Sequence, residues 1–108
     1  MDEQEFRDRA DKALDDLYKR LSTAAEQYDF EADFNSGALA IEFESPPAKF
    51  VVSPNAPVRQ VWVSAHMKSF KLEWEPGRNA FVLPGSGQTL VALLADAIGQ
   101  QLNKEVSL

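Results

Sequence analysis

The sequence predicts an α+β fold, a two-layer sandwich in which two helices pack on one face of an antiparallel sheet of about six strands. Two observations support this prediction. Apolar residues recur at steps of three and four near both ends of the chain, whereas apolar and polar residues alternate in the middle. Short turn segments separate the alternating stretches, and strands joined by tight turns pair antiparallel.

The two predicted helices cover about residues 4–25 and residues 89–102. The apolar stripe of the first helix consists of Phe6, Ala10, Ala13, Leu14, Leu17, Leu21 and Ala24. The apolar face of the second consists of Leu90, Leu93, Leu94, Ala97 and Ile98. Either Ser86 or Thr89 is suited to cap the second helix at its N-terminus.

Six strands are predicted between the helices. They cover residues 30–34, 39–44, 50–52, 58–64, 70–75 and 81–83. Gly37 suits the tight turn of the first hairpin, because glycine adopts positive φ without strain. Pro46 and Pro47 are predicted to end the second strand, and Pro54 and Pro57 to frame a rigid loop.

Length and composition limit the classes of protein that remain. The chain has 108 residues, of which 44% are hydrophobic, and we expect one domain over residues 1–108. It has no cysteine and one histidine, which excludes disulfides, thiolate metal sites and a cysteine nucleophile. No apolar run is long enough to span a membrane, and the N-terminus does not resemble a targeting peptide. We therefore expect no membrane association and a bacterial cytoplasmic location, with a mature mitochondrial form as the alternative.

The negative charge is concentrated in the first part of the chain. Residues 1–44 contain 13 acidic and 5 basic residues, a net charge of −8, whereas residues 45–108 contain 4 acidic and 6 basic ones, a net charge of +2. This distribution argues against nucleic acid as a partner, because phosphate binding depends on Lys and Arg. It favours cations or a basic protein surface.

Three carboxylates form an acidic face on the first helix. Asp8, Asp11 and Asp15 lie within about 60° of one another on a helical projection, and carboxylates suit hard cations. The polar face of the first two strands adds Glu31, Asp33, Glu42 and Glu44. The expected i,i+4 ion pairs are Glu5–Arg9, Asp8–Lys12, Asp15–Lys19 and Asp16–Arg20. Two interpretations remain open: a solvated, ion-paired face, or a binding surface that would relieve the repulsion around Asp11.

The strand around Trp62 contains a candidate binding anchor. Because side chains alternate along a strand, Val61 and Val63 share one face, and Gln60, Trp62 and Ser64 share the other. If the helices cover the valine face, Trp62 is exposed, as a typical binding anchor is. The alternative is that Trp62 packs under a loop.

A catalytic site is not predicted. His66, the only histidine, lies in a predicted loop near Ser64 and is interpreted as an ordinary loop residue. The carboxylates lie on exposed faces, where an acid and base pair with separated pKa values is not expected. Trp74 is in phase with Phe70 and Leu72, which predicts a place in the core.

The stretch of residues 55–64, Asn-Ala-Pro-Val-Arg-Gln-Val-Trp-Val-Ser, resembles the signature of the frataxin family, Pro-x-x-Gln-(Ile/Val)-Trp-(Leu/Val)-Ser. Other segments agree in order, and the resemblance covers about residues 4–103. These segments are Glu5-Phe6 with Ala10-Asp11, residues 36–41, and Gly87 with Leu90, Leu93 and Leu94.

The resemblance implies two roughly parallel helices on a twisted sheet and a role in iron–sulfur cluster biogenesis. It implies weakly bound Fe²⁺ or Fe³⁺ as cofactor, and a cysteine desulfurase and an iron–sulfur scaffold protein as partners. The metal-binding residues it implies are Glu5, Asp8, Asp11, Asp15, Asp16, Asp29, Glu31 and Asp33. The partner-binding residues it implies are Asn55, Gln60, Trp62 and Lys71.

The chain also departs from the family pattern. Further acid pairs are common late in the first helix of bacterial members, but Tyr18, Lys19, Ser22 and Thr23 stand there in this chain. The loop before the signature contains Ser53-Pro54 where many members have Asn and a basic residue. We therefore expect fewer iron sites, and different contacts from that loop.

The function predicted is that of an iron-binding regulatory adaptor, which docks on the desulfurase–scaffold complex and modulates cluster synthesis. The alternative is a ferroxidase and iron-storage protein that oligomerises with iron, so weak ferroxidase activity is the only enzymatic role left open. A third possibility is an acidic sandwich that binds only protein. Pro46, Pro47 and Pro54, expected near a sheet edge, predict a monomer without iron.

Overall fold

The computed structural model describes all of residues 1–108 and forms two layers. The elements in chain order are α1 (Glu3–Ala24), β1 (Glu31–Asn35), β2 (Ala38–Glu44), β3 (Pro47–Asn55), the 3₁₀ turn η1 (Ala56–Val58), β4 (Gln60–Ala65), β5 (Lys68–Glu75), β6 (Ala80–Leu83), β7 (Gln88–Thr89) and α2 (Leu90–Leu102). The seven strands lie in sequence order, and all neighbours are antiparallel. Neither helix combines the length and the hydropathy needed to cross a bilayer.

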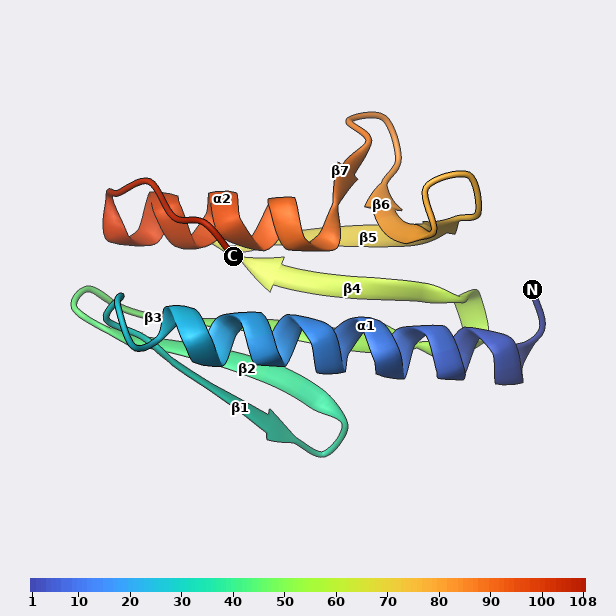
Figure 1. The fold of residues 1–108 in the computed structure, drawn as a ribbon, viewed down its shortest axis with the longest axis horizontal. Helices are drawn as coiled ribbons and strands as arrows, with labels where there is room; N and C mark the ends of the chain where they lie inside the picture. The colour runs from blue at the N-terminus through green and yellow to red at the C-terminus, as the bar shows by residue number, and fades with distance from the viewer.

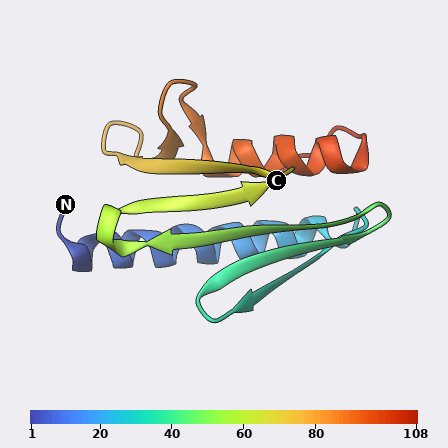
Figure 2. The ribbon, with the colours of Figure 1, turned by 180° about the vertical axis from the view of Figure 1, so that it is seen from behind.

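The two helices lie side by side on one face of the sheet and run in the same direction (Figure 1). The other face carries no helix, as the view from behind shows (Figure 2). The predicted α+β sandwich with roughly parallel helices is therefore confirmed. The uncovered face of the sheet remains available for contacts with other molecules.

The sheet differs from the prediction in two places. It has seven strands, because Gln88 and Thr89 pair with β6 in a segment expected to be a turn and a helix cap. Strand β3 has nine residues and includes Pro47 and Pro54, so the prediction that these prolines lie outside strands is wrong. Proline fits there because its fixed φ suits extended backbone and only its N–H is lost near a strand end.

The expectation that the prolines lie near a sheet edge is also wrong. Strand β3 lies between β2 and β4, and the edges of the sheet are β1 and β7. Strand β1 carries the exposed charges of Glu31 and Asp33, and β7 has only two residues. Charged and very short edge strands both disfavour edge-to-edge pairing.

One cluster of 22 buried residues fills the space between the helices and the sheet. Phe6 of α1 meets Phe81 of β6 edge-on, with ring centroids 5.8 Å apart. Trp74 is half-buried on the helix side of the sheet, where it packs on Phe81 at 5.1 Å. Thr89 caps α2 by accepting a hydrogen bond from the backbone N–H of Ala92 at 3.2 Å. This contact selects Thr89 over Ser86 as the N-cap.

His66 lies in the turn between β4 and β5. Its Nε2 atom donates a hydrogen bond to the carbonyl oxygen of Ala97 in α2, at 2.9 Å. Its ring also meets Phe50 at 5.0 Å. The ring thus ties the turn to the second helix, which supports a structural role.

Candidate functional site

The first candidate surface, which we call the tryptophan face, consists of Asn55, Gln60, Trp62 and Lys71 on the uncovered side of the sheet. Val61 and Val63 are buried under the helices, with 0% and 1% exposure. Since side chains alternate along β4, Gln60 and Trp62 project from the opposite face. The predicted orientation of Trp62 is confirmed, although its side chain is half-buried rather than free in solvent.

Neighbouring side chains hold the Trp62 ring in place. Its Nε1 atom donates to Gln60 Oε1 at 2.9 Å, and Gln60 Nε2 donates to Glu73 Oε2 at 3.1 Å. The ammonium of Lys71 lies 4.9 Å from the centre of the ring, within the range of a cation–π contact. Because both polar ends of Gln60 are engaged, the indole is fixed before any partner arrives.

The pairing of β4 with β5 explains why these residues meet. Trp62 lies opposite Lys71, and Gln60 lies opposite Glu73. The sequence prediction missed Glu73. Its position two residues after Lys71 on the same strand face was the available signal, because residues i and i+2 of a strand share a face.

Asn55 belongs to the same cross-strand row. It pairs with Gln60 across the β3–β4 connection and is half-buried at the start of η1. Arg59 closes this connection with a positive φ of 52°, and its guanidinium donates to the carbonyl oxygens of Ala56 and Met1, each at 3.1 Å. The structure therefore brings all four residues predicted for partner binding to one face.

A small hollow adjoins Trp62 on this face. It encloses about 110 Å³ and is lined mainly by Val51, Ser53, Ser64 and Ser69 around the indole. Small side chains beside a fixed aromatic ring leave room for a side chain of a partner. The sequence alone does not reveal this hollow, because its walls come from β3, β4 and β5.

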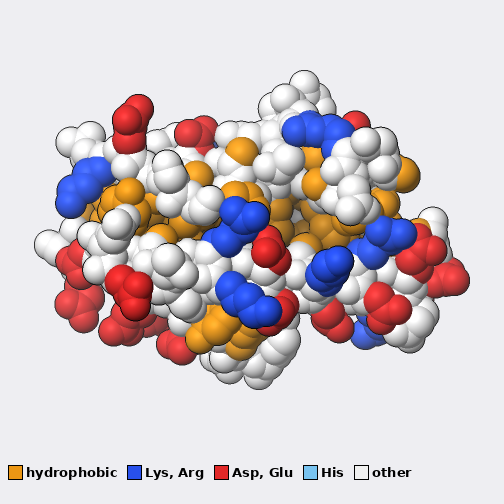
Figure 3. Space-filling view, viewed as in Figure 1, with side chains coloured by type: hydrophobic (Ala, Val, Ile, Leu, Met, Phe, Trp, Pro, Cys, Tyr) orange, Lys and Arg blue, Asp and Glu red, His pale blue; other side chains and the backbone are white.

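The second candidate surface, the acidic ridge, consists of the eight predicted metal-binding residues. All eight are exposed: Glu5, Asp8, Asp11, Asp15, Asp16, Asp29, Glu31 and Asp33. Acidic side chains gather on the half of the molecule that contains α1 and β1, interspersed with basic ones along the helix (Figure 3). The ridge is therefore a surface of mixed charge.

Ion pairs engage much of the α1 part of the ridge. Three predicted pairs are present, with N–O distances of 3.2, 3.1 and 2.8 Å: Arg9–Glu5, Lys19–Asp15 and Arg20–Asp16. The predicted pair of Asp8 with Lys12 is absent, because Asp8 accepts instead from Gln4 Nε2 at 2.9 Å. Asp11 has no cationic partner.

Asp11 lies on the side of α1 that is nearest to the edge strand β1. Tyr18 is seven residues later, about two helical turns, and so shares this side. The Tyr18 ring packs on Phe34 of β1, with centroids 5.0 Å apart. Glu31 and Asp33 alternate with Phe34 and therefore point to the opposite face of β1.

The ridge is thus divided between the helix surface and the far face of the edge strand. No three acidic or histidine side chains anywhere in the chain gather closely enough to hold a metal ion. The arrangement suits an open, water-exposed association with cations or with a basic protein surface. It does not form a closed coordination cage.

A helix–meander–helix sandwich with a fixed tryptophan on its uncovered face and an acidic first helix defines a frataxin-like protein. The model of the frataxin-like domain family matches residues 1–104. The chain therefore belongs to the frataxin family.

Similar proteins agree with this assignment. A relative from Herminiimonas arsenicoxydans is 30% identical over 115 residues, with 100% of this chain and 96% of the relative covered. A relative from Pseudomonas aeruginosa is 29% identical over 108 residues, with 98% and 95% covered. Both bear the name iron-sulfur cluster assembly protein CyaY. The solved structure of frataxin from Psychromonas ingrahamii is similar with a TM-score of 0.78 and 26% identity, covering 99% of this chain and 97% of that one.

Proposed function

We propose that this protein is an iron-binding regulatory adaptor of iron–sulfur cluster assembly. It docks on the complex of cysteine desulfurase and scaffold protein through the tryptophan face and modulates cluster synthesis. The observation that carries the proposal is the Trp62 ring fixed by Gln60 and Lys71 on the uncovered face of the sheet. The names of the relatives, iron-sulfur cluster assembly protein, support the same role.

The tryptophan face supports docking rather than chemistry. Tryptophan is enriched among the residues that dominate binding energy at protein interfaces. A ring fixed in advance loses little side-chain entropy on binding, so more of its contact energy is retained. The groups that hold the ring are an amide and an ammonium, from Gln60 and Lys71, and both contact the indole rather than a bound substrate.

The acidic ridge supports two further parts of the proposal. Its carboxylates are hard ligands that accept iron with water completing the coordination, which makes the binding weak. A cation near Asp11 also offsets the repulsion from Asp8 and Asp15. The same charges attract a basic patch on the desulfurase, which raises the rate of encounter.

A ferroxidase that stores iron is not favoured by the arrangement of the carboxylates. Two-metal sites hold their ions about 3.5–4 Å apart and need several ligands in one place. The ridge provides no group of three such ligands.

The proposal is tested by heteronuclear NMR on the apo protein under anaerobic conditions, first with Fe²⁺ and then with the desulfurase. We expect iron to broaden signals of residues 8–16 and 31–33, and the desulfurase to shift the Trp62 indole signal. Absence of any response to millimolar iron would remove the iron role. Absence of a Trp62 response to a bound desulfurase would remove the docking role.

A matched pair of variants controls for net charge. Asp11→Asn lies on the ridge, whereas Asp96→Asn lies on α2, where Asp96 accepts a hydrogen bond from Gln88 at 3.0 Å. Both variants remove one negative charge. We expect only Asp11→Asn to reduce the response to iron, and equal responses would show that iron senses net charge rather than the ridge.

A further inference from the structure

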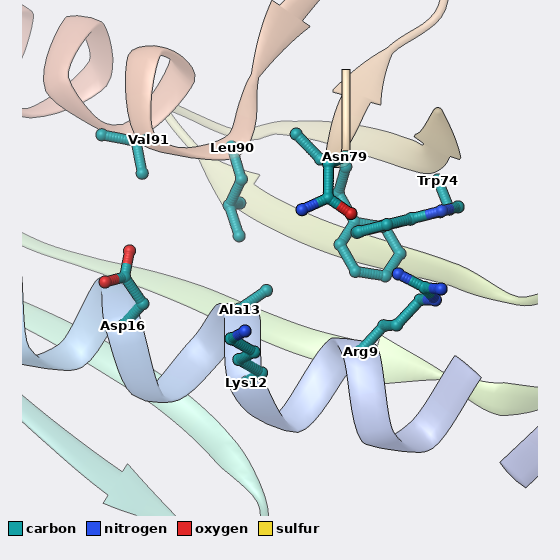
Figure 4. Close-up of a pocket in the computed structure, with 10 residues that line it drawn as sticks. Arg9, Lys12, Ala13, Asp16, Trp74, Asn79, Leu90 and Val91 are labelled. Carbon is teal, nitrogen blue, oxygen red and sulfur yellow. The ribbon is translucent and has the colours of Figure 1, made fainter. Parts of the chain in front are cut away.

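A second site is suggested by a hollow between α1, β6 and α2, on the side of the molecule opposite to the tryptophan face. It encloses about 260 Å³. Six of its ten lining residues are hydrophobic, Phe81 among them. Trp74 and Leu90 border the hollow from β5 and α2 (Figure 4). A partly open hollow with largely apolar walls suits a small hydrophobic ligand.

Two cationic side chains stand on the α1 side of this hollow. The guanidinium of Arg9 lies over the Trp74 ring, 4.4 Å from its centre, and also pairs with Glu5 at 3.2 Å. Lys12 lines the hollow but forms no ion pair, because Asp8 is engaged with Gln4. One ammonium group without an ion pair therefore stands beside an apolar surface.

The remaining polar groups of the hollow are compatible with an anion. Asp16 is the one acid in its lining, and its carboxylate is paired with Arg20 at 2.8 Å. Asn79 directs its amide toward the hollow from the other side (Figure 4). The Asn79 amide, an uncharged donor, thus complements the charge of Lys12.

We propose that this hollow binds a small amphipathic anion, with an aromatic or aliphatic ring system against Trp74 and a carboxylate or sulfonate toward Lys12. The volume lies just below the range of about 300–1,000 Å³ that is typical of pockets for larger ligands, so one or two fused rings fit. The hollow shares only Asp16 with the acidic ridge, and this inference assigns no role in ligand binding to Asp16. The inference does not depend on the proposed function.

The test uses 2-naphthoate as the probe and 2-naphthamide as its neutral counterpart of nearly the same shape. Each is titrated into the ¹⁵N-labelled protein, and the two indole N–H signals are followed. We expect 2-naphthoate to shift the Trp74 signal saturably, with a Kd on the order of 1 mM. The Trp62 signal, on the opposite face of the sheet, is the internal reference and stays in place.

Two lysine variants separate the local charge from the net charge. Lys12→Gln removes the ammonium group beside the hollow, whereas Lys19→Gln makes the same change at a residue paired with Asp15. We expect Lys12→Gln to weaken 2-naphthoate binding about fivefold, as for an exposed charge contact. Lys19→Gln should leave the affinity for 2-naphthoate unchanged. Neither variant should change the affinity for 2-naphthamide.

A third variant tests the hollow itself. Ala13 lines it, and Ala13→Leu places a larger side chain there. We expect both probes to lose their effect on Trp74, with a thermal unfolding curve recorded to show that the variant is folded. Equal binding of the two probes, equal effects of both lysine variants, or no saturable shift of Trp74 would each overturn the proposal.

Discussion

The tryptophan face and the acidic ridge differ in how their side chains are held. On the tryptophan face, Trp62 is fixed through Gln60 and Lys71, residues on the central strands of the sheet. On the ridge, the helical acids contact mainly side chains one turn away in the same helix, such as Lys19 with Asp15. The first surface depends on the tertiary structure, whereas the second depends on one helix and an edge strand.

This difference indicates two modes of recognition. A fixed aromatic ring provides a shape-specific contact that resists dissociation. Exposed charges act at a distance and are screened by salt over a Debye length of about 8 Å at physiological ionic strength. We therefore expect the tryptophan face to determine affinity and the ridge to determine association rate and cation binding.

The largest expected effect is that of Trp62→Ala. Because truncation of a central interface tryptophan costs at least about 2 kcal/mol, binding to the desulfurase–scaffold complex should weaken about 30-fold or more. Isothermal titration calorimetry measures the affinity, and a cluster assembly assay measures the loss of regulation. A folded Trp62→Ala variant with unchanged assembly rates would contradict the docking role.

Gln60→Ala should have a smaller effect on the same surface. It removes the acceptor of the Trp62 indole N–H and the donor to Glu73, so that only the contact with Lys71 still holds the ring. We expect about fivefold weaker partner binding, corresponding to about 1 kcal/mol for one hydrogen bond. Gln100→Ala, at an exposed residue of α2, is the control and should bind as the wild type does.

The double variant Asp11→Asn/Asp15→Asn tests the ridge. We expect a fewfold loss of iron affinity by calorimetry, since exposed charges each contribute up to about 1 kcal/mol. Partner affinity should fall less than with Trp62→Ala, and the association rate should become less dependent on salt. Unchanged iron affinity would favour the interpretation of an acidic sandwich that binds only protein.

The smallest expected effect concerns stability. Asp11→Asn removes repulsion between like charges and should raise the free energy of unfolding by about 0.2–0.5 kcal/mol at low salt. Urea denaturation measures this change, and high salt should abolish it. Asp15→Asn should not raise the free energy of unfolding, because Lys19 loses its partner. Equal changes in the free energy of unfolding for the two variants would contradict this account.

Local periodicity predicted much of the fold. The apolar stripe from Phe6 to Ala24 predicted α1 to within one residue at each end. Alternation around Trp62 identified which side chains share a face of the strand, because strand parity is a property of the backbone alone. The same reasoning placed Trp74 toward the core, whereas the choice of Thr89 over Ser86 as the cap of α2 came from the structure.

Other features depended on contacts between residues far apart in the chain. The pairing of β7 with β6 and the inclusion of Pro54 in β3 depend on neighbouring strands, which local propensity does not describe. Asp8 does not pair with Lys12 because it accepts a hydrogen bond from Gln4 instead. Both partners lie four residues from Asp8, so their spacing does not decide between them.

The sequence by itself determined the two helices and which side chains of each strand share a face, because these follow from repeats of two or 3.6 residues along one segment. Only the tertiary structure placed Lys71 against the indole, divided the acidic ridge between two faces and enclosed the hollow beside Trp74. Those features arise from strand register and helix packing. They depend on contacts between side chains of different elements, which meet only when the chain is folded.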